Sequence, residues 1–397
     1  MKYIVIVPDG AADYPLEILG GKTPLEAAET PNMDSLASKG VIGRAKTVPE
    51  GFRPASDVAN LSLLGYSPEL YYTGRAPFEA ANIGVELGEK DIAFRCNFIT
   101  AVDGKLFDYS AGHISTRESH TLVDYLNQHL SSDRIKFYAG VSYRNLMVYK
   151  EGLDLGLDKI ECFPPHDIMG KLIDKYLPRG KAAAEIVALM KESEKLLEAH
   201  EVNSVRIDLK ENPANMIWLW GQGKKPQIED FVSRFGLRGG VISAVDLIKG
   251  IGKTIGLEVI EVEGATGYYD TNYAGKAEAA IEALKRLDFV YIHIEAPDEA
   301  GHNEDTQMKI ISLERIDKLV VGKILEKFSL DEVRILIAPD HFTPISLRTH
   351  SPEPVPFLVA GKNIPHSGAG SFCERQAQES SLFFEDASGL INYLIKE

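Results

Sequence analysis

The sequence predicts an α/β protein with a second domain inserted into the first. A continuous apolar, β-branched run at residues 3–7 (YIVIV) is typical of a strand buried on both faces of a parallel sheet. In the C-terminal half, further apolar runs alternate with helix-like segments, and this alternation favours an α/β sheet. From about residue 115 to 235 the pattern is mixed, which indicates a separate α+β domain.

The N-terminal helix that follows the first strand has a signal at each end. Thr30 is a cap-like residue, Pro31 stands at a first helical position, and Gly40 is expected to end the helix. A further helix is expected in the stretch PASDVANLSLLGY, which contains Ser56. A serine before an apolar helical run usually caps the helix, because its oxygen accepts a free backbone N–H of the first turn. This stretch alone therefore favours a cap over a nucleophile.

Three strands and two helices are expected in the C-terminal half. The strands are GLEVIEVEG (256–264), DFVYIHIEA (288–296) and EVRILIAPD (332–340), and the helices are 275–287 and 308–328. The mixed middle part contains a long helix-like run and both tryptophans. We therefore predict a catalytic domain made of residues 1–114 and 236–397, and an inserted α+β domain made of residues 115–235.

Composition excludes several classes of partner. The 397 residues are enough for two domains, and the net charge of −15 argues against broad nucleic-acid binding, which needs a basic face. Cys96, Cys162 and Cys373 are widely spaced and odd in number, which fits a reducing compartment. No run approaches the roughly 18 apolar residues of a membrane span. We therefore expect a cytoplasmic protein with no membrane partner.

Three aspartates follow predicted strands. Asp9 ends the first strand, Asp298 follows the strand at 288–296, and Asp340 ends the strand at 332–340. Ligands of open α/β sheets bind at the carboxyl ends of the strands. Three carboxylates at that edge would repel each other unless a cation lay between them.

Histidines accompany these aspartates. His302 lies four residues after Asp298, His341 follows Asp340 directly, and His350 comes nine residues later. Imidazole nitrogens and carboxylate oxygens together suit zinc, manganese or similar ions. With Asp9 and Ser56 there are seven candidate ligands, which suggests two metal ions. We interpret the other histidines considered as structural: His120, His129, His200 and His293.

Two cations would give Ser56 a role. Paired metal ions stabilise the attacking and leaving oxygens of an in-line displacement at phosphorus. They also lower the pKa of a coordinated hydroxyl, which a serine needs in order to act as a nucleophile. Backbone amides at the start of a helix can hold a phosphate oxygen. The cap and the nucleophile interpretations of Ser56 therefore share one geometry.

At this point the chain resembles the alkaline phosphatase superfamily and, within it, the archaeal-type cofactor-independent phosphoglycerate mutases that also occur in bacteria. The motifs run over nearly the whole chain: VPDGAAD, PASDVANLSLLGY, TGRAPFEAANIG, AFRCNF, DYSAGHIST, PPHDIMGK, APDEAGHNED and PDHFTPISLRTHSPEPVPF. The resemblance implies an alkaline-phosphatase-like sandwich with a largely parallel central sheet, plus an inserted α+β domain that binds substrate.

The resemblance also implies an activity. Such an isomerase interconverts 3-phosphoglycerate and 2-phosphoglycerate in glycolysis and gluconeogenesis, without 2,3-bisphosphoglycerate and through a phosphoserine at Ser56. It implies two divalent metal ions, with manganese expected first and magnesium, zinc or cobalt compatible with the ligands. One ion would be held by Asp9, Ser56, Asp340 and His341, and the other by Asp298, His302 and His350.

Substrate-binding residues are carried over from the same resemblance. Arg95, His113 and Arg144 come first, and Arg75 and Lys249 come behind them. An arginine can bind a phosphate or carboxylate through two parallel hydrogen bonds, and His113 is a candidate acid/base for the glycerate oxygens. For Arg144 and Lys249 a structural ion pair is an equally good interpretation.

Other functions are compatible with the same residues. A metal-dependent phosphohydrolase, or another phosphomutase of the superfamily, would use the same two-metal serine site. A non-catalytic metal-binding scaffold would be expected to lose a ligand or Ser56, and all seven positions carry competent side chains. The expected partner is therefore a small phosphorylated molecule, and a homo-oligomer is compatible with the sequence.

Overall fold

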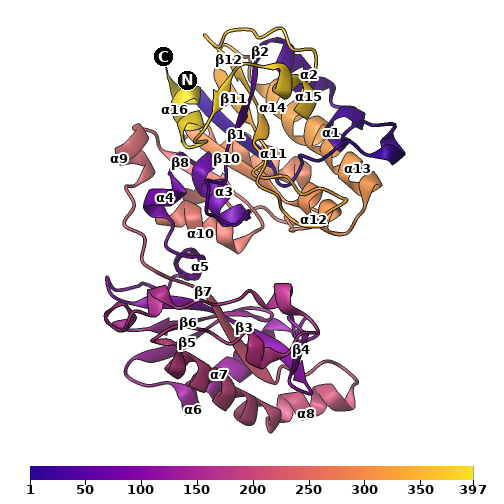
Figure 1. Ribbon diagram of the computed structural model, residues 1–397. Coiled ribbons are helices and arrows are strands. Elements are labelled where there is room, and N and C mark those ends of the chain that lie inside the picture. Colours follow the sequence, from indigo (N-terminus) through magenta and orange to yellow (C-terminus); the bar gives the residue numbers. More distant parts are fainter. Residues whose placement is uncertain (397) are drawn as a thin grey trace. The chain divides into compact units, whose positions relative to one another are not determined.

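A computed structural model describes residues 1–396, and the chain divides into two compact units. The first unit combines Met1–Tyr72 with the chain from Ile228 onward, and the second is Thr73–Gln227 (Figure 1). Each unit has its own sheet and its own hydrophobic core. None of the helices in the described residues has the length and apolarity that crossing a bilayer requires.

The first unit is built on an eight-stranded sheet. Its strand order is β13-β2-β12-β11-β1-β10-β8-β9. Five of its seven strand pairings are parallel, and only the two pairings of β12 are antiparallel. This confirms the predicted α/β fold with a largely parallel central sheet. The strands are β1 (Lys2–Pro8), β2 (Gly40–Ala45), β8 (Gly239–Ile242), β9 (Glu258–Val259), β10 (Phe289–Ile294), β11 (Val333–Ile337), β12 (Val355–Gly361) and β13 (Phe383–Phe384).

Helices cover both faces of this sheet (Figure 1). Ile4 and Ile6 of β1 belong to a core shared with α2, α11, α13 and α14, whereas Val5 and Val7 point to the other face and are also fully buried. Burial on both faces explains the unbroken apolar run at the N-terminus. The helices are α1 (Pro24–Ala27), α2 (Pro31–Ser38), α3 (Ser56–Leu63), α4 (Pro68–Tyr71), α9 (Phe231–Phe235), α10 (Asp246–Thr254), α11 (Tyr273–Ala283), α12 (Ala296–His302), α13 (Thr306–Ile316), α14 (Gly322–Lys327), α15 (Glu374–Glu379) and α16 (Gly389–Ile395), with a short η1 (Glu17–Leu19) and a π-helical segment, Asp317–Val321, between α13 and α14.

Some predicted boundaries differ from the structure. The strand expected over 256–264 contains only β9, because this edge of the sheet pairs for two residues. Gly40 does not end α2; it begins β2 instead. A Cβ at Gly40 would lie 2.2 Å from the carbonyl oxygen of Val359, so the close approach of β12 explains this glycine.

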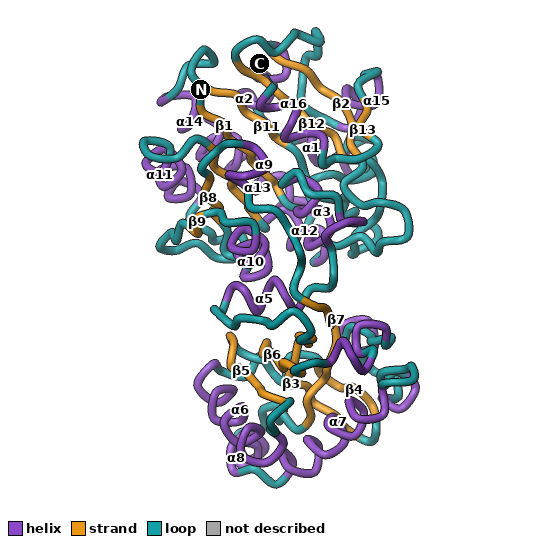
Figure 2. Tube along the Cα trace, turned by 90° about the vertical axis from the view of Figure 1, so that its left-hand side faces the viewer, coloured by secondary structure: helices purple, strands orange, loops and turns teal. Residues whose placement is uncertain are grey.

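The second unit is an antiparallel α+β structure. Its sheet has the order β4-β3-β6-β5, and β7 pairs with β3. Figure 2 shows the helices α6 and α7 beside this sheet. Helix α6 packs on β5 and α7 packs on β7, and the core between them contains the fully buried Trp218. The elements are α5 (Ala76–Asn82), β3 (Ile92–Val102), β4 (Lys105–Asp108), α6 (Thr116–Leu130), β5 (Ile135–Val141), β6 (Arg144–Tyr149), α7 (Ala183–Glu198), α8 (Glu201–Asp208) and β7 (Met216–Lys224), with 3-10 turns at Gly152–Leu155, Leu157–Lys159, Pro165–Ile168 and Ile173–Lys175.

The start of this unit corrects the expected domain limits. The sequence pattern placed the inserted domain at 115–235, whereas the compact unit begins at Thr73 and ends at Gln227. The reason is β3, whose partners are β4, β6 and β7 of the same sheet. Strand pairing therefore draws the segment before residue 115 into the second unit.

One buried ion pair connects α13 with the segments that follow β1 and β11. Lys309 of α13 is fully buried, and its Nζ lies 2.7 Å from Asp13 Oδ2 and 2.8 Å from the carbonyl oxygen of Thr343. Asp13 also accepts backbone N–H groups from Tyr14 and Ile345. The two charges are thus paired with each other and hydrogen-bonded to the backbone, as burial requires.

Replacing one partner of this pair is expected to destabilise the protein. Lys309→Met leaves the buried Asp13 carboxylate without its counter-charge, so the free energy of unfolding should fall by about 3–5 kcal/mol. The control is Lys285→Met, because Lys285 and its partner Glu282 have side chains 65% and 72% exposed and their pair should contribute less than about 1 kcal/mol. Guanidinium unfolding followed by circular dichroism measures both variants. Equal losses in the two would contradict the structural role of the buried pair.

Candidate active site

The carboxyl edge of the central sheet gathers the predicted acidic residues. Asp9 follows β1, Asp340 follows β11, and Asp298 lies in α12, directly after β10. Since β1 pairs in parallel with both β10 and β11, the three strands end at the same edge. The topology therefore brings Asp9 next to two aspartates that lie more than 280 positions further along the chain.

The first cluster contains Asp9, Asp340 and His341. Candidate ligand atoms of these three residues all lie within 4.8 Å of one another. His341 Nε2 is 3.5 Å from Asp9 Oδ1 and 3.3 Å from Asp340 Oδ2, and Ser56 Oγ is 3.2 Å from the same nitrogen. The structure thus places all four residues of the first expected metal site together.

The second cluster contains Asp298, His302 and His350. His302 and Asp298 lie four residues apart on α12, so they share one face of the helix, and Nε2 is 3.3 Å from Oδ2. His350 Nε2 lies 3.4 Å from Asp298 Oδ1 and 3.0 Å from His302 Nε2. His341 also reaches this cluster, since candidate atoms of Asp298, His341 and His350 lie within 4.8 Å of one another. The two clusters therefore adjoin at His341, which the sequence assigned to the first alone.

The buried carboxylates at this edge of the sheet are suited to binding cations. Burial and the neighbouring carboxylates of Asp340 and Asp298 raise the pKa of Asp9 well above its usual value. Within residues 1–396, Asp9 Oδ1 is buried and has no hydrogen-bond partner. Burial opposes ionisation of Asp298, but hydrogen bonds from His302 and His350 prevail and hold its pKa well below the usual range. Buried carboxylates, one of them with an unpartnered oxygen, together with imidazole nitrogens are a donor set for divalent ions.

Ser56 does not act as a helix cap. It is the first residue of α3, the capping position belongs to Ala55, and no side-chain hydrogen bond caps this helix. The local preference for a cap is therefore wrong here, and the hydroxyl faces His341 instead. Asn60, one turn further along α3, donates to both the Ser56 carbonyl and Asp340 Oδ2, each at 2.8 Å, and this fixes α3 against the first cluster.

Two residues of this edge were missed by the sequence interpretation. His293, which was taken as structural, lies with Nε2 3.0 Å from Asp9 Oδ2 and Nδ1 3.3 Å from Ser243 Oγ. Burial lowers the pKa of His293 to about 4, so the ring is neutral. Asn60 was read only as part of an apolar helix. A polar residue inside the otherwise apolar β10 was the available signal for His293, because every position of that strand is buried.

In the second unit, two of the predicted arginines form one cluster. Arg75 Nε lies 3.1 Å from Glu79 Oε1, and Arg95 Nε lies 2.9 Å from Glu79 Oε2. The Arg95 guanidinium is also 4.3 Å from the centre of the Trp220 ring. Burial lowers the pKa of Arg95 to about 10. Two guanidinium groups with one carboxylate leave a net positive charge, which suits an anionic group.

His113 and Arg144 both lie near the ring of Tyr143 in the same unit. The His113 ring centre is 6.3 Å from that of Tyr143, and the Arg144 guanidinium is 4.4 Å from it. Both side chains are exposed, and His113 adopts a φ of 51°. Lys249 belongs to α10 of the first unit and pairs at 2.7 Å with Glu261, which agrees with the ion-pair interpretation of this residue.

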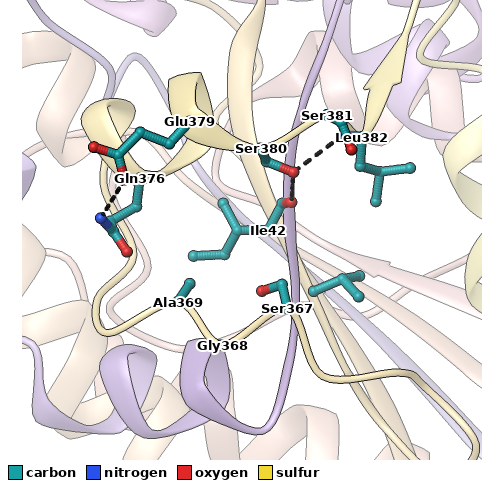
Figure 3. A pocket seen from close by; sticks show the side chains of 10 residues that line it. Ile42, Ser367, Gly368, Ala369, Gln376, Glu379, Ser380, Ser381 and Leu382 are labelled. Carbon is teal, nitrogen blue, oxygen red and sulfur yellow. Dashed lines mark hydrogen bonds between the residues drawn. The ribbon is translucent and has the colours of Figure 1, made fainter.

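A hollow on the first unit lies away from both clusters. Its volume is about 460 Å³, and its walls come from β2 and the segment around α15 (Figure 3). Ser380 Oγ donates to the Ile42 carbonyl at 2.6 Å, and Gln376 donates to Glu379 at 3.0 Å. The lining contains no candidate ligand, so geometry and charge, rather than the size of a hollow, locate the candidate site.

These observations define an α/β protein with two adjoining clusters of candidate metal ligands at the carboxyl edge of its sheet. Comparison with known proteins then specifies the family. A family model described as 2,3-bisphosphoglycerate-independent phosphoglycerate mutase matches residues 37–203. A protein of that name from Methanosarcina mazei is 52% identical, over the full length of both chains. The chain belongs to the 2,3-bisphosphoglycerate-independent phosphoglycerate mutase family, which confirms the resemblance seen in its motifs.

Solved structures agree with this assignment. A protein from Pyrococcus horikoshii is 32% identical, with a TM-score of 0.84 over 99% of this chain and 96% of that one. The cofactor-independent phosphoglycerate mutase from Thermoplasma acidophilum is 28% identical, with a TM-score of 0.68 over 100% of this chain and 99% of that one.

The lack of space around Gly10 predicts that a side chain at this position would disturb the candidate metal ligands. Gly10 has a φ of +60°, and a Cβ there would lie 2.6 Å from Asp298 Oδ1 and 2.5 Å from Thr343 Oγ1. Gly10→Ala should therefore weaken Mn²⁺ binding by about tenfold or more, measured by isothermal titration calorimetry on chelator-treated protein.

Gly20→Ala is the matched control for Gly10→Ala. Gly20 has a φ of +65° with nothing within 4 Å of an added Cβ, so its substitution brings the same backbone strain without the crowding. Its Mn²⁺ affinity should stay within about twofold of the wild type, since no group near the metal ligands moves. Similar affinities for the two variants would show that Gly10 does not maintain the site.

Proposed function

We propose that this protein interconverts 3-phosphoglycerate and 2-phosphoglycerate without 2,3-bisphosphoglycerate, as an isomerase of glycolysis and gluconeogenesis. The observation that carries the proposal is the Ser56 hydroxyl, 3.2 Å from His341 Nε2, at the edge of two adjoining carboxylate and histidine clusters. The substrate follows from the full-length similarity to the mutase of Methanosarcina mazei.

The two clusters are proposed to hold two divalent ions. Asp9, Ser56, Asp340 and His341 would hold one, and Asp298, His302 and His350 the other, with His341 bordering both. When bound, such ions neutralise charge on the phosphoryl group and lower the pKa of a serine hydroxyl. Manganese is proposed first, and the same donors accept magnesium, zinc or cobalt.

Ser56 is proposed as the nucleophile. Its Oγ loses its proton and forms a bond to phosphorus while the bond from phosphorus to the glycerate oxygen breaks, and the departing oxygen takes up a proton. The other hydroxyl of the retained glycerate then loses its proton and attacks the same phosphorus, the bond from phosphorus to Ser56 Oγ breaks, and Oγ takes up a proton. Helix α3 begins at Ser56, so the positive end of its dipole would lie beside the negative charge of the phosphoryl group.

Cations of the second unit are proposed to bind the glycerate. Arg75 and Arg95 offer a net positive charge around Glu79, and Arg144 offers an exposed guanidinium. His113, exposed beside Tyr143, is the proposed acid/base for the glycerate oxygens. Lys249 would have to exchange its partner Glu261 for substrate, and the Glu261 side chain, 72% exposed, is free to turn into solvent.

Phosphorus NMR tests the proposed activity. The protein with Mn²⁺ and 3-phosphoglycerate, and without 2,3-bisphosphoglycerate, should produce a growing 2-phosphoglycerate signal. Exhaustive treatment with a chelator should stop the reaction, and added Mn²⁺ should restore it, because the candidate ligands supply the electrostatics only with cations present. Inorganic phosphate as the sole product would instead make the protein a phosphohydrolase, and no reaction would refute the substrate.

Ser56→Ala tests the nucleophile. Turnover should fall by at least about 1,000-fold, because removing a nucleophile leaves only the binding contribution to catalysis. The phosphoserine that mass spectrometry should detect on the Ser56 peptide after a quench should also disappear.

Ser62→Ala is the control for Ser56→Ala. Ser62 lies in the same helix, and its hydroxyl donates to the Thr47 carbonyl at 2.7 Å, so its loss costs about 1 kcal/mol of stability and leaves turnover within about threefold. Turnover by Ser56→Ala comparable with that of this control would refute the nucleophile assignment.

A further inference from the structure

Thr343 lies between the two clusters, although it is not a candidate ligand. Its side chain is fully buried. Thr343 Oγ1 is 2.5 Å from Asp298 Oδ1, in the second cluster, and 3.1 Å from His341 Nδ1, at the border of both. One hydroxyl group therefore touches a carboxylate and an imidazole that are expected to serve different metal ions.

The hydrogen bonds of the Thr343 hydroxyl determine which ring nitrogen of His341 carries the proton and which one keeps its lone pair. An ionised carboxylate only accepts hydrogen bonds, so the single proton of the Thr343 hydroxyl goes to Asp298. The same oxygen then offers only lone pairs to His341, and Nδ1 must carry the ring proton. The other nitrogen, Nε2, keeps its lone pair and faces Ser56, Asp9 and Asp340.

The backbone around Thr343 is held on both sides. Its N–H donates to the Ala12 carbonyl at 3.2 Å, and its carbonyl accepts from Lys309 Nζ at 2.8 Å. The other partner of Lys309 is Asp13, which also accepts the N–H of Ile345 at 3.1 Å. The buried ion pair thus anchors the segment that presents the hydroxyl.

Two glycines make room for this residue. A Cβ at Gly10, next to Asp9, would lie 2.5 Å from Thr343 Oγ1. A Cβ at Gly301, next to His302, would lie 2.5 Å from the Thr343 carbonyl oxygen. Gly10 and Gly301 each stand next to a candidate ligand, and neither has a side chain where Thr343 packs. The glycines on both sides therefore allow Thr343 to approach the ligands closely.

We propose that Thr343 is a positioning residue that holds His341 in its Nδ1–H form and orients Asp298, so that one hydroxyl prepares both metal sites. This inference rests on the proposed metal centre and extends it to a residue outside the ligand set. Removing a group that fixes the tautomer of a metal-binding histidine typically lowers metal affinity by about 10- to 100-fold.

Three substitutions at Thr343 test the hydroxyl separately from packing. Thr343→Ser and Thr343→Ala both lose the methyl group and differ only in the hydroxyl, and Thr343→Val keeps the shape without the hydroxyl. In chelator-treated protein titrated with Mn²⁺ by calorimetry, Ala and Val should weaken binding by about 10- to 100-fold, and Ser should stay within about threefold of the wild type. The visible spectrum of Co²⁺-loaded protein should change in Ala and Val but not in Ser.

Either of two results would overturn the inference. Wild-type Mn²⁺ affinity in both Ala and Val would show that the hydroxyl is not needed, and an equal loss in Ser and Ala would assign the effect to the methyl group. Melting of the metal-free proteins identifies any variant that fails to fold, and the Ser and Ala pair then decides the question without Val.

The phosphorus NMR assay on the wild type keeps the two proposals apart. Hydroxyl-dependent Mn²⁺ binding without formation of 2-phosphoglycerate would refute the proposed function and keep the role of Thr343. Formation of 2-phosphoglycerate with unchanged Mn²⁺ binding in Thr343→Ala and Thr343→Val would support the proposed function and refute the role of Thr343.

Discussion

The repulsion among three buried carboxylates is the constraint on which the rest of the first unit depends. Asp9, Asp298 and Asp340 are drawn to one edge because β1 pairs in parallel with β10 and with β11. Burial, together with the neighbouring carboxylates of Asp340 and Asp298, raises the pKa of Asp9, and bound cations would compensate this cost in folding free energy. The arrangement is therefore poor for stability alone and well suited to binding divalent ions.

The surroundings of this edge serve to hold it in place. Asn60 connects α3 to Asp340, His293 lies against Asp9, and Thr343 joins Asp298 to His341. These contacts come from side chains that carry no charge in this setting, so they add orientation without adding repulsion. Among the residues that the structure describes, two buried lysines are bonded to this framework, and neither bond goes to a candidate ligand. Lys309 binds Asp13 and the Thr343 carbonyl, and Lys276 donates to the His293 carbonyl at 2.8 Å.

The second unit contains a cluster in which positive charge, rather than negative charge, is in excess. Its cluster has two guanidinium groups around Glu79, and the aromatic face of Trp220 covers one of them. Burial makes the unbalanced charge costly in the free protein, and an anionic ligand would remove that cost. The carboxylates of the first unit need cations before an anion can approach them, whereas this cluster can accept an anionic group directly.

The sequence by itself determined the fold class, the strand ends and the kinds of ligand, because burial on two faces and residues that directly follow a strand are local properties. Tertiary structure decided what depends on distance: that His341 borders both clusters, that Ser56 faces it rather than capping α3, and that Lys249 pairs with Glu261. It also decided that strand pairing draws the chain from Thr73 into the second unit. The contact of Thr343 with Asp298 and that of His293 with Asp9 join residues 45 and 284 positions apart, and only packing brings these pairs within hydrogen-bonding distance.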